Sequence, residues 1–456
     1  MGKAKFSNFM IILLGSTGGI LFGYDNGIIG GALIFLTKDF NLTSLGSSLT
    51  VSSILIGAFI GAPIAGYVAD LAGRRVVIFA MGVVFLVGSI LSYIVVTDVQ
   101  LIVVRLILGL SVGGSSALVP LYLSEMAPTH MRGMLASWDQ LMINTGTLLS
   151  TIVGFLLAVS GNWRLMFGLA IIPSIIMVLG VLVMPESPRW LITKDRVAEA
   201  RAIMLKTRSA DETETELAGI VAANSLESNG LKDLAKPYMR KILVLAMVVL
   251  AIQQFSGINT ILFYLPTILT GMGVSVKAAM AVNIGSASLG IICTLIFSRL
   301  IDKTGRRPML LRSSIMLSAA LFTLSMCAFV GGKNPTIVTG IVFLVAVYWF
   351  RIFYSAGWGP GAWVYVSEIF PLRVRGRASS IAIMANWGAN FLVAFMFPLM
   401  TAKFGIGVTL LFFVGFNILG FFYVKAKLFE TKGLSLEQIE EHFRGLDAGD
   451  SEKVAA

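Results

Sequence analysis

The chain of 456 residues is 56% hydrophobic and only 13% charged, and its mean hydropathy is +0.87. A soluble domain carries about 25% charged residues, so this composition excludes a water-soluble globular protein, as well as disordered, collagen-like and coiled-coil chains. The net charge of +11 would suit a nucleic-acid-binding protein only if the basic residues gathered on one soluble surface. Long apolar runs that do not alternate instead predict a helical membrane protein rather than a barrel.

Apolar runs of spanning length predict twelve transmembrane helices. In chain order they cover residues 9–36, 46–69, 76–96, 100–122, 134–158, 165–184, 240–269, 276–300, 309–330, 337–365, 376–401 and 406–425. The predicted organisation is all-α, with an N-terminal six-helix half in residues 1–188 and a C-terminal half in residues 240–425. Between them, residues 189–239 are charged and are expected to form short amphipathic helices on the cytoplasmic side, while residues 426–456 form a charged cytoplasmic tail.

The two halves repeat one another in sequence. Three motifs of the first half, at Asp70-Leu-Ala-Gly-Arg-Arg75, Ser124-Glu-Met-Ala-Pro128 and Pro185-Glu-Ser-Pro188, recur in the second half. Their counterparts are Asp302-Lys-Thr-Gly-Arg-Arg307, Ser367-Glu-Ile-Phe-Pro371 and Phe429-Glu-Thr-Lys-Gly433, at offsets of 232, 243 and 244 residues. Three matches in the same order predict two pseudo-symmetric six-helix halves.

The basic residues are distributed unevenly along the predicted topology. Of the 35 Lys and Arg residues, 28 fall in the termini and even-numbered loops and five in the opposite loops, which leaves two, Arg105 and Arg351, inside helices. The positive-inside rule places both termini in the cytoplasm of a multi-pass cell-membrane protein. The first apolar run is too long for a cleavable signal peptide. The positive charge is therefore read as an orientation signal, and no nucleic-acid partner is expected.

Residue types that carry covalent or metal chemistry are sparse. Cys293 and Cys327 both lie in apolar runs, so no disulfide framework is expected. No cluster of histidines and cysteines has the spacing of a metal site, and no nucleophile lies beside a base. We expect no enzyme activity, no cofactor and no metal, and a protein that functions as a monomer.

The repeated Asp-x-x-Gly-Arg-Arg loops follow the second helix of each half. Their carboxylate can cap a helix or pair with arginines, and their glycine permits a tight turn. Simple positive-inside anchoring is the alternative, but duplication favours a cytoplasmic gate. The predicted gate residues are Asp70, Arg74, Arg75, Glu125, Arg132, Asp302, Arg306, Arg307, Glu368 and Arg375.

Together with the two repeated loops, three further motifs resemble the sugar porter family of the major facilitator superfamily. They are Pro185-Glu-Ser-Pro-Arg-Trp190, Gln253-Gln-Phe-Ser-Gly-Ile-Asn259 and Glu430-Thr-Lys-Gly433, and the resemblance covers essentially the whole chain. One departure is Phe429, where the family usually has proline. The resemblance implies transport of a D-glucose- or D-xylose-type monosaccharide across the lipid bilayer by alternating access. The family contains both proton symporters and facilitative uniporters.

Three amides in the seventh helix, Gln253, Gln254 and Asn259, surround an interruption at Gly257. Amides both donate and accept hydrogen bonds, so they match sugar hydroxyls, although hydrogen bonding between helices is the alternative. The resemblance implies that these three amides bind the sugar. It adds Gln140, Trp363, Asn386, Trp387 and Phe22 to the site, with Trp363 beneath the sugar ring and Asn390 one turn beyond Asn386; for each aromatic, ordinary core packing is the alternative. The segment Gly359-Pro-Gly-Ala-Trp363 is expected to break the tenth helix.

Asp25 lies inside the first apolar run, and Arg105 in the fourth is the expected partner. A carboxylate in a membrane is costly unless it is paired or protonated, so it marks a proton or ion site. The resemblance implies that this pair couples sugar uptake to protons. A static ion pair in a uniporter, or in a non-transporting sugar sensor, is the alternative. The sequence does not indicate a function for Asp139 or Arg351.

Overall fold

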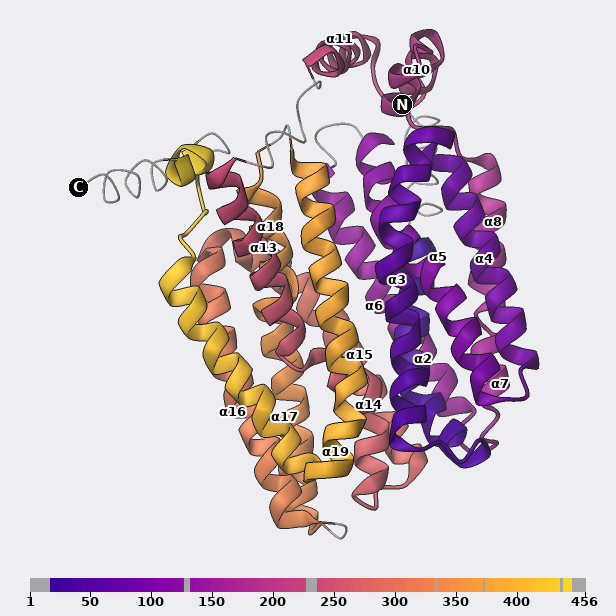
Figure 1. Cartoon of the computed structure of the whole chain (residues 1–456), viewed down its shortest axis with the longest axis vertical. Coiled ribbons are helices and arrows are strands. Elements are labelled where there is room, and N and C mark those ends of the chain that lie inside the picture. Colours follow the sequence, from indigo (N-terminus) through magenta and orange to yellow (C-terminus); the bar gives the residue numbers. More distant parts are fainter. Residues whose placement is uncertain are drawn as a thin grey trace. The chain divides into compact units, whose positions relative to one another are not determined.

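The computed structural model describes residues 17–126, 132–226, 236–332, 335–371, 374–434 and 438–444, and these are helical almost throughout (Figure 1). The chain divides into two compact units. The first unit contains Met1–Leu42 and Leu49–Ser228, and the second contains Thr43–Ser48 and Asn229–Ala456. Each unit is described by itself below.

The first unit is built mainly from apolar helices, most of them long. They are α2 (Thr17–Asp39), α3 (Ser44–Ala72, within this unit from Leu49 on), α4 (Arg74–Ile94), α5 (Asp98–Met126), α6 (Arg132–Leu156), α7 (Trp163–Gly168) and α8 (Ile171–Val183). Helices α7 and α8 follow one another, separated by the turn residues Leu169 and Ala170. They therefore form one predicted transmembrane segment with a break near its start.

Glycines allow the helices of the first unit to approach closely. A Cβ at Gly57 of α3 would lie 2.1 Å from the carbonyl oxygen of Leu106 on α5. A Cβ at Gly146 of α6 would lie 2.1 Å from the carbonyl oxygen of Ile20 on α2. Such close backbone contact is typical of membrane helices, in which small residues replace the hydrophobic driving force available in water.

The second unit contains α13 (Pro237–Phe255), α14 (Ile258–Gly271), α15 (Val276–Thr304), α16 (Arg306–Gly331), α17 (Ile337–Ala356), α18 (Trp358–Ile369) and α19 (Arg375–Lys427). Gly257 separates α13 from α14 with a left-handed φ of 92°, at the predicted interruption. Within α19, Gly405 has φ 79°, which divides this element into two helices.

The break in the tenth predicted helix lies earlier than expected. It falls at Gly357, and the segment from Gly359 to Trp363 is helical within α18. The prediction that this segment itself interrupts the helix is therefore wrong. Pro360 is the third residue of α18, and a proline is tolerated there because the first helical N–H groups have no partner within the helix.

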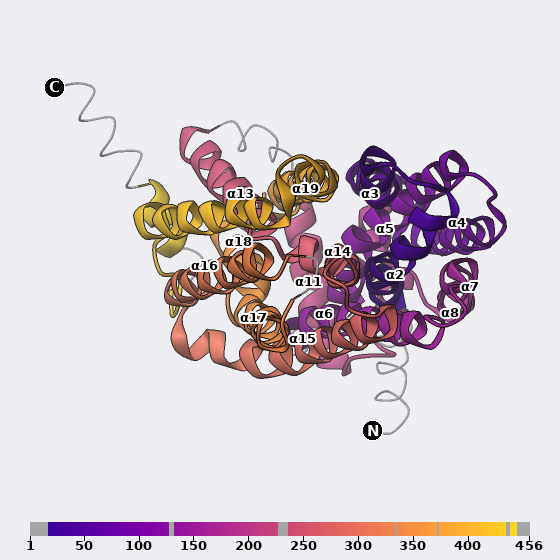
Figure 2. The ribbon, with the colours of Figure 1, turned by 90° about the horizontal axis from the view of Figure 1, so that it is seen from below.

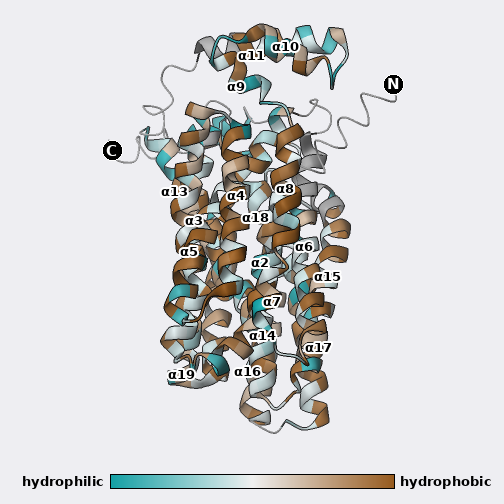
Figure 3. Cartoon of the chain, turned by 90° about the vertical axis from the view of Figure 1, so that its right-hand side faces the viewer, coloured by the Kyte–Doolittle hydropathy of each residue, from teal (hydrophilic) through white to brown (hydrophobic). Residues whose placement is uncertain are grey.

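The all-helical membrane fold is confirmed. Among the described residues, ten helical spans are long and apolar enough to cross a membrane, and α6 adds a shorter apolar helix. With α19 counted as two helices, these spans account for the twelve predicted ones. Figure 3 shows the hydrophobic residues along the long helices, while α9, α10 and α11 carry many hydrophilic ones.

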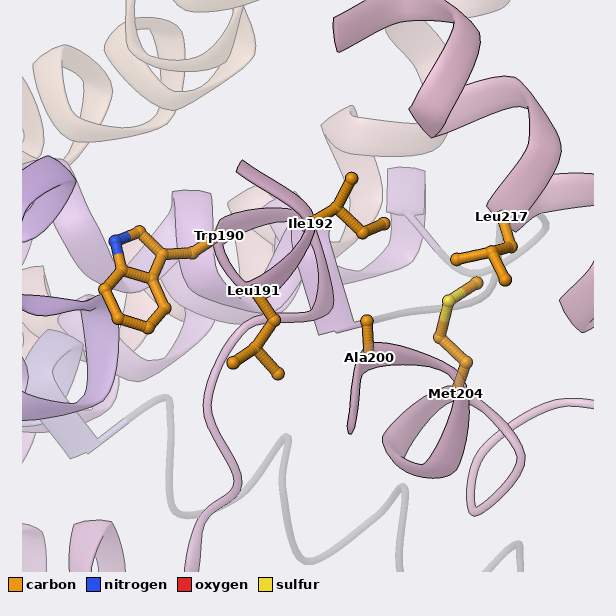
Figure 4. Close-up of a cluster of buried hydrophobic side chains, with 6 residues drawn as sticks. All are labelled: Trp190, Leu191, Ile192, Ala200, Met204 and Leu217. Atoms are coloured by element: carbon orange, nitrogen blue, oxygen red, sulfur yellow. The ribbon is translucent and has the colours of Figure 1, made fainter. Parts of the chain in front are cut away.

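Three short helices follow α8 in the first unit: α9 (Pro188–Thr193), α10 (Val197–Met204) and α11 (Ala210–Leu226). They enclose a small hydrophobic cluster formed by Trp190, Leu191, Ile192, Ala200, Met204 and Leu217 (Figure 4). Ion pairs from Arg201 to Glu214 at 2.6 Å and from Arg208 to Glu216 at 2.8 Å lie in the same region. The indole nitrogen of Trp190 donates to the carbonyl oxygen of Asp70 at 3.1 Å, which anchors this subdomain to the end of α3.

Candidate functional site

The structure brings Asp25 and Arg105 together in the interior of the first unit. Their exposed fractions are 4% and 0%, and two guanidinium nitrogens each lie 3.4 Å from a carboxylate oxygen. The third guanidinium nitrogen, Nε, donates to the carbonyl oxygen of Thr50 on α3 at 2.6 Å. The acidic and basic charges therefore compensate each other where water is excluded, which a buried charge in a membrane requires.

A network of amide side chains lies in the interior of the second unit. Asn259 donates to the side-chain oxygens of Gln254 and, at 2.7 Å, of Asn390. Gln254 donates to Asn386 at 3.0 Å, and Asn386 donates in turn to Gln253 at 3.0 Å. Helices α13, α14 and α19 thus contribute to one cluster of neutral donors and acceptors.

The backbone beside the two helix breaks takes part in this network. The Nε2 group of Gln253 donates to the carbonyl oxygens of Trp358 at 2.9 Å and Gly359 at 3.0 Å, at the start of α18. Asn417 of α19 donates to the carbonyl oxygen of Ser256, next to the Gly257 break, at 3.1 Å. Broken helices expose polar backbone groups, and in membrane proteins these are tolerated where they find partners or line a cavity.

The remaining predicted sugar ligands have different surroundings. In the second unit Trp387 is buried, whereas Trp363 of α18 is 37% exposed. In the first unit Phe22 is half-buried and Gln140 is exposed. The four predicted amides of the second unit therefore form one hydrogen-bonded cluster. The other four predicted ligands differ from one another in burial, and two of them belong to the first unit.

The first predicted gate loop is built around Glu186. This carboxylate accepts hydrogen bonds from the backbone N–H groups of Arg74 at 2.9 Å and Arg75 at 3.1 Å, at the start of α4. The Arg74 side chain pairs with Asp70 at 3.0 Å and with Glu125 at 3.3 Å. The sequence suggests Asp70 as the capping carboxylate, but the residue that caps α4 is Glu186.

The second loop repeats this arrangement. Glu430 accepts from the backbone N–H groups of Arg306 and Arg307, both at 3.0 Å, and Arg306 pairs with Glu368 at 2.7 Å. Thr431 donates to Glu368 at 2.6 Å, as Ser187 donates to Glu125 in the first unit. The loops therefore share one design, in which a glutamate from the end of each unit's helical repeat caps a helix that begins with two arginines.

Not every predicted gate residue is seen in this role. Arg375 donates to the carbonyl oxygen of Phe370 at 3.0 Å, and the arginine that pairs with Glu368 is Arg306. The side chains of Arg132 and Asp302, and that of Asp139, lie outside the described part of the structure.

Sequence reasoning missed the capping glutamates, the hydroxyl groups of Ser187 and Thr431, and Asn417. Glu186 and Glu430 occupy matching places in the third repeated motif, and that recurrence is the signal that could have assigned them to the gate. Asn417 is a lone amide in an otherwise apolar run, and a polar residue in such a run usually has an internal partner.

Known proteins are similar to this chain over nearly its whole length. The sequence model of a family described as "Sugar (and other) transporter" matches residues 11–443. The glucose transporter GlcP of Staphylococcus epidermidis is 36% identical over 441 residues, which cover 96% of this chain and 98% of that protein. The D-xylose transporter of Levilactobacillus brevis is 36% identical over 460 residues and is matched over 99% of both chains.

A solved structure is similar over nearly the whole chain. It is the proton:xylose symporter XylE bound to 6-bromo-6-deoxy-D-glucose, with 29% sequence identity and a TM-score of 0.79. The match covers 96% of this chain and 99% of that one.

Proposed function

The chain belongs to the sugar porter family of the major facilitator superfamily and is a sugar transporter, not an enzyme; from this premise we propose that it imports a monosaccharide together with a proton. The substrate class that we propose is a D-glucose- or D-xylose-type sugar. We place the protein in the cell membrane as a monomer with both termini in the cytoplasm, as its loop charges favour.

The amide network supports a neutral, hydroxyl-rich substrate. Its members carry no charge, and each amide offers two donors and an acceptor with two lone pairs. A sugar that enters among Gln253, Gln254 and Asn259 exchanges amide–amide hydrogen bonds for amide–hydroxyl ones. This exchange leaves few buried polar groups unpaired, which is the main cost of binding a polar ligand. The exposed indole of Trp363 offers an apolar face to the C–H side of the ring.

The buried ion pair carries the proposal of proton coupling. Protonation of Asp25 removes its negative charge and weakens its attraction to Arg105, so the interior of the first unit has two states that differ by one proton. We propose that the protonated, sugar-loaded protein changes its direction of access and that proton release to the cytoplasm restores the pair.

The two units are proposed to be the repeated halves that rock during transport. The Glu125–Arg74 and Glu368–Arg306 clusters would then close the cytoplasmic side and open when sugar and proton are both bound. The binding energy of the two ligands drives this change only if they bind the two conformations with different affinities.

The test is a pH trace on purified protein in lightly buffered proteoliposomes with no imposed gradient. Addition of a transported sugar should make the external medium more alkaline, and a proton-conducting ionophore should abolish the signal. Sugar entry with an unchanged external pH would identify a uniporter, and the absence of any entry would favour a sensor. The same assay with D-glucose, D-xylose, D-galactose and D-fructose identifies the substrate.

A further inference from the structure

Helix α7 is a short element that packs against the helices around the Asp25–Arg105 pair. It is separated from α8 by Leu169 and Ala170, and in Figure 2 it lies beside α4. Within the first unit it lies at the end opposite to α10 (Figure 1). Helix α7 therefore lies on the side of the ion pair that faces away from the predicted cytoplasmic loops.

Two hydrogen bonds join α7 to α2. The Tyr24 hydroxyl, adjacent to Asp25 in the chain, donates to the carbonyl oxygen of Met166 at 2.7 Å. At the other end of α2, Asp39 accepts from the indole nitrogen of Trp163 at 2.7 Å. A third bond, from Arg164 to the carbonyl oxygen of Val95 at 3.1 Å, joins α7 to the end of α4. The short helix is therefore held at several points against its neighbours.

Phe167 of α7 lies directly against the ion pair. The central guanidinium carbon of Arg105 is 5.7 Å from the centre of the Phe167 ring, within the range of a cation–π contact. Phe167 is 3% exposed and Tyr24 is 4% exposed. Phe167 therefore covers one side of the Arg105 guanidinium, and the buried Tyr24 side chain ties α2 to the helix that carries Phe167.

Arg105 therefore keeps two contacts that do not depend on the charge of Asp25. One is the Thr50 carbonyl oxygen, at 2.6 Å from Nε, and the other is the Phe167 ring. Among the described residues, the charged partner of Asp25 is Arg105 of α5, and the titratable side chain next to Asp25 in the chain is Tyr24. When Asp25 takes up a proton, the guanidinium can remain in place, and the carboxyl group is the partner that changes.

We propose that α7 separates the Asp25–Arg105 pair from the solution on the side of the membrane where α7 lies. In this proposal Phe167 blocks the path to the pair, and Tyr24 positions α7. This inference rests on the proposed proton symport. A symporter must expose its proton site to one side at a time, because simultaneous access from both sides would let protons cross without sugar. Phe167 provides that barrier on the α7 side, and the Tyr24–Met166 hydrogen bond holds it closed.

The experiment measures proton flux without sugar. Purified full-length protein is placed in proteoliposomes that contain a pH-sensitive dye, and a pH gradient is imposed together with a potassium–valinomycin clamp. We expect Phe167→Ala to increase the sugar-independent flux about tenfold over wild type, which corresponds to a barrier lowered by about 1.4 kcal/mol. Tyr24→Phe should give a smaller increase. Phe59→Ala, at an exposed position of α3, is the matched aromatic control and should stay at the wild-type level.

A double variant tests whether the leak runs through the ion pair. Asp25→Asn combined with Phe167→Ala should return the flux to the wild-type level, because the amide cannot carry the proton. A leak that persists in the double variant would overturn the inference, and so would Phe167→Ala vesicles that exchange sugar and remain proton-tight. If Phe167→Ala does not fold, Phe167→Leu and Tyr24→Phe decide by the same criterion.

Failure of this inference is distinct from failure of the proposed function. Wild-type protein that moves sugar without alkalinising the medium would refute symport. Wild-type protein that couples normally, while the Phe167 and Tyr24 variants do not leak, would refute only the role of α7.

Discussion

The two units of the protein are alike at their predicted gate loops and different in their centres. In both, a glutamate caps a helix that begins with two arginines, and the first arginine pairs with a second glutamate. At the centre, the first unit holds one buried ion pair, whereas the second holds a network of neutral amides. The repetition is therefore close in these loops, whereas the polar groups at the two centres differ in chemistry.

The difference fits the two proposed tasks, which need different chemistry. A carboxylate beside a guanidinium changes its interactions when it gains a proton, so it can report a proton gradient. Amides do not titrate in the physiological range, and they can form hydrogen bonds with an uncharged sugar at any pH. We therefore interpret the first centre as the proton site and the second as the main sugar site.

The largest expected effect comes from removing the charge of the first centre. Asp25→Asn should abolish sugar accumulation against a gradient while it leaves sugar exchange in proteoliposomes intact, because the amide no longer changes its charge. Asp195→Asn is the matched control: Asp195 is exposed, and asparagine readily adopts its left-handed backbone (φ 58°). A variant that still concentrates sugar in a proton gradient would remove Asp25 from the coupling site.

A substitution in the amide network of the second unit should weaken sugar binding without changing proton coupling. Gln254→Ala removes one donor to Asn386 and one acceptor of Asn259, and it leaves both partners buried. At about 1–2 kcal/mol for hydrogen bonds of this kind, we expect the sugar Kd to rise roughly tenfold. Binding is measured by tryptophan fluorescence or calorimetry, with Gln100→Ala as the control. An unchanged Kd would show that α13 does not belong to the sugar site.

The gate loops should respond equally in both units. Gly73 and Gly305 have φ values of 102° and 95°, and a Cβ would lie 2.3 Å and 2.6 Å from the capping carboxylates of Glu186 and Glu430. Strain of about 1–3 kcal/mol should lower the melting temperature in detergent by several degrees in Gly73→Ala and in Gly305→Ala. Gly340→Ala, where a Cβ meets no other atom, is the control. Unequal changes in melting temperature would mean that the two loops do not contribute equally to the stability of the protein.

The smallest effect is expected outside the two centres. Arg196 hydrogen-bonds Glu199 on the solvent-exposed side of α10, and this bond lowers the pKa of Glu199 below its usual range. Any stabilisation from the pair is present above the unfolded carboxyl pKa and is lost as the pH falls through the lowered value. Because solvent screens both charges, Arg196→Ala should leave the melting temperature unchanged between pH 4 and pH 8.

A buried ion pair in the same group of short helices should contribute more to stability than the exposed Arg196–Glu199 pair. Arg208→Ala should lower the melting temperature measurably, since the Arg208 side chain is only 1% exposed where it pairs with Glu216. A larger effect at Arg196 than at Arg208 would contradict the argument from burial.

Much of the membrane topology was predictable because it depends on local sequence. The bilayer demands long apolar helices, so the runs that became α2, α4, α16 and α19 are visible without a structure. Gly257 was also recognisable, because glycine readily supplies a left-handed residue between two helices. The break at Gly357 was misplaced by two residues because Pro360 fits inside the first turn of α18.

The partners within each site were less predictable. Residue type and spacing nominated Asp25, Arg105 and the amides of the second half, but they did not reveal that Phe167 lies against Arg105 or that Asn417 supports the break at Gly257. Both contacts join elements that are distant in the sequence, and an ordinary phenylalanine in an apolar run gives no signal of its own.

The sequence by itself determined the class of protein, the number of spanning helices and the repeat, because each follows from composition, run length or recurrence along one chain. It also nominated the buried charges, since a carboxylate inside an apolar run stands out wherever it points. Only the tertiary structure decided that Glu186 and Glu430, rather than Asp70, cap α4 and α16, and which side chains surround the ion pair. Those outcomes depend on distances between helices, which arise from packing and are not encoded in any single segment.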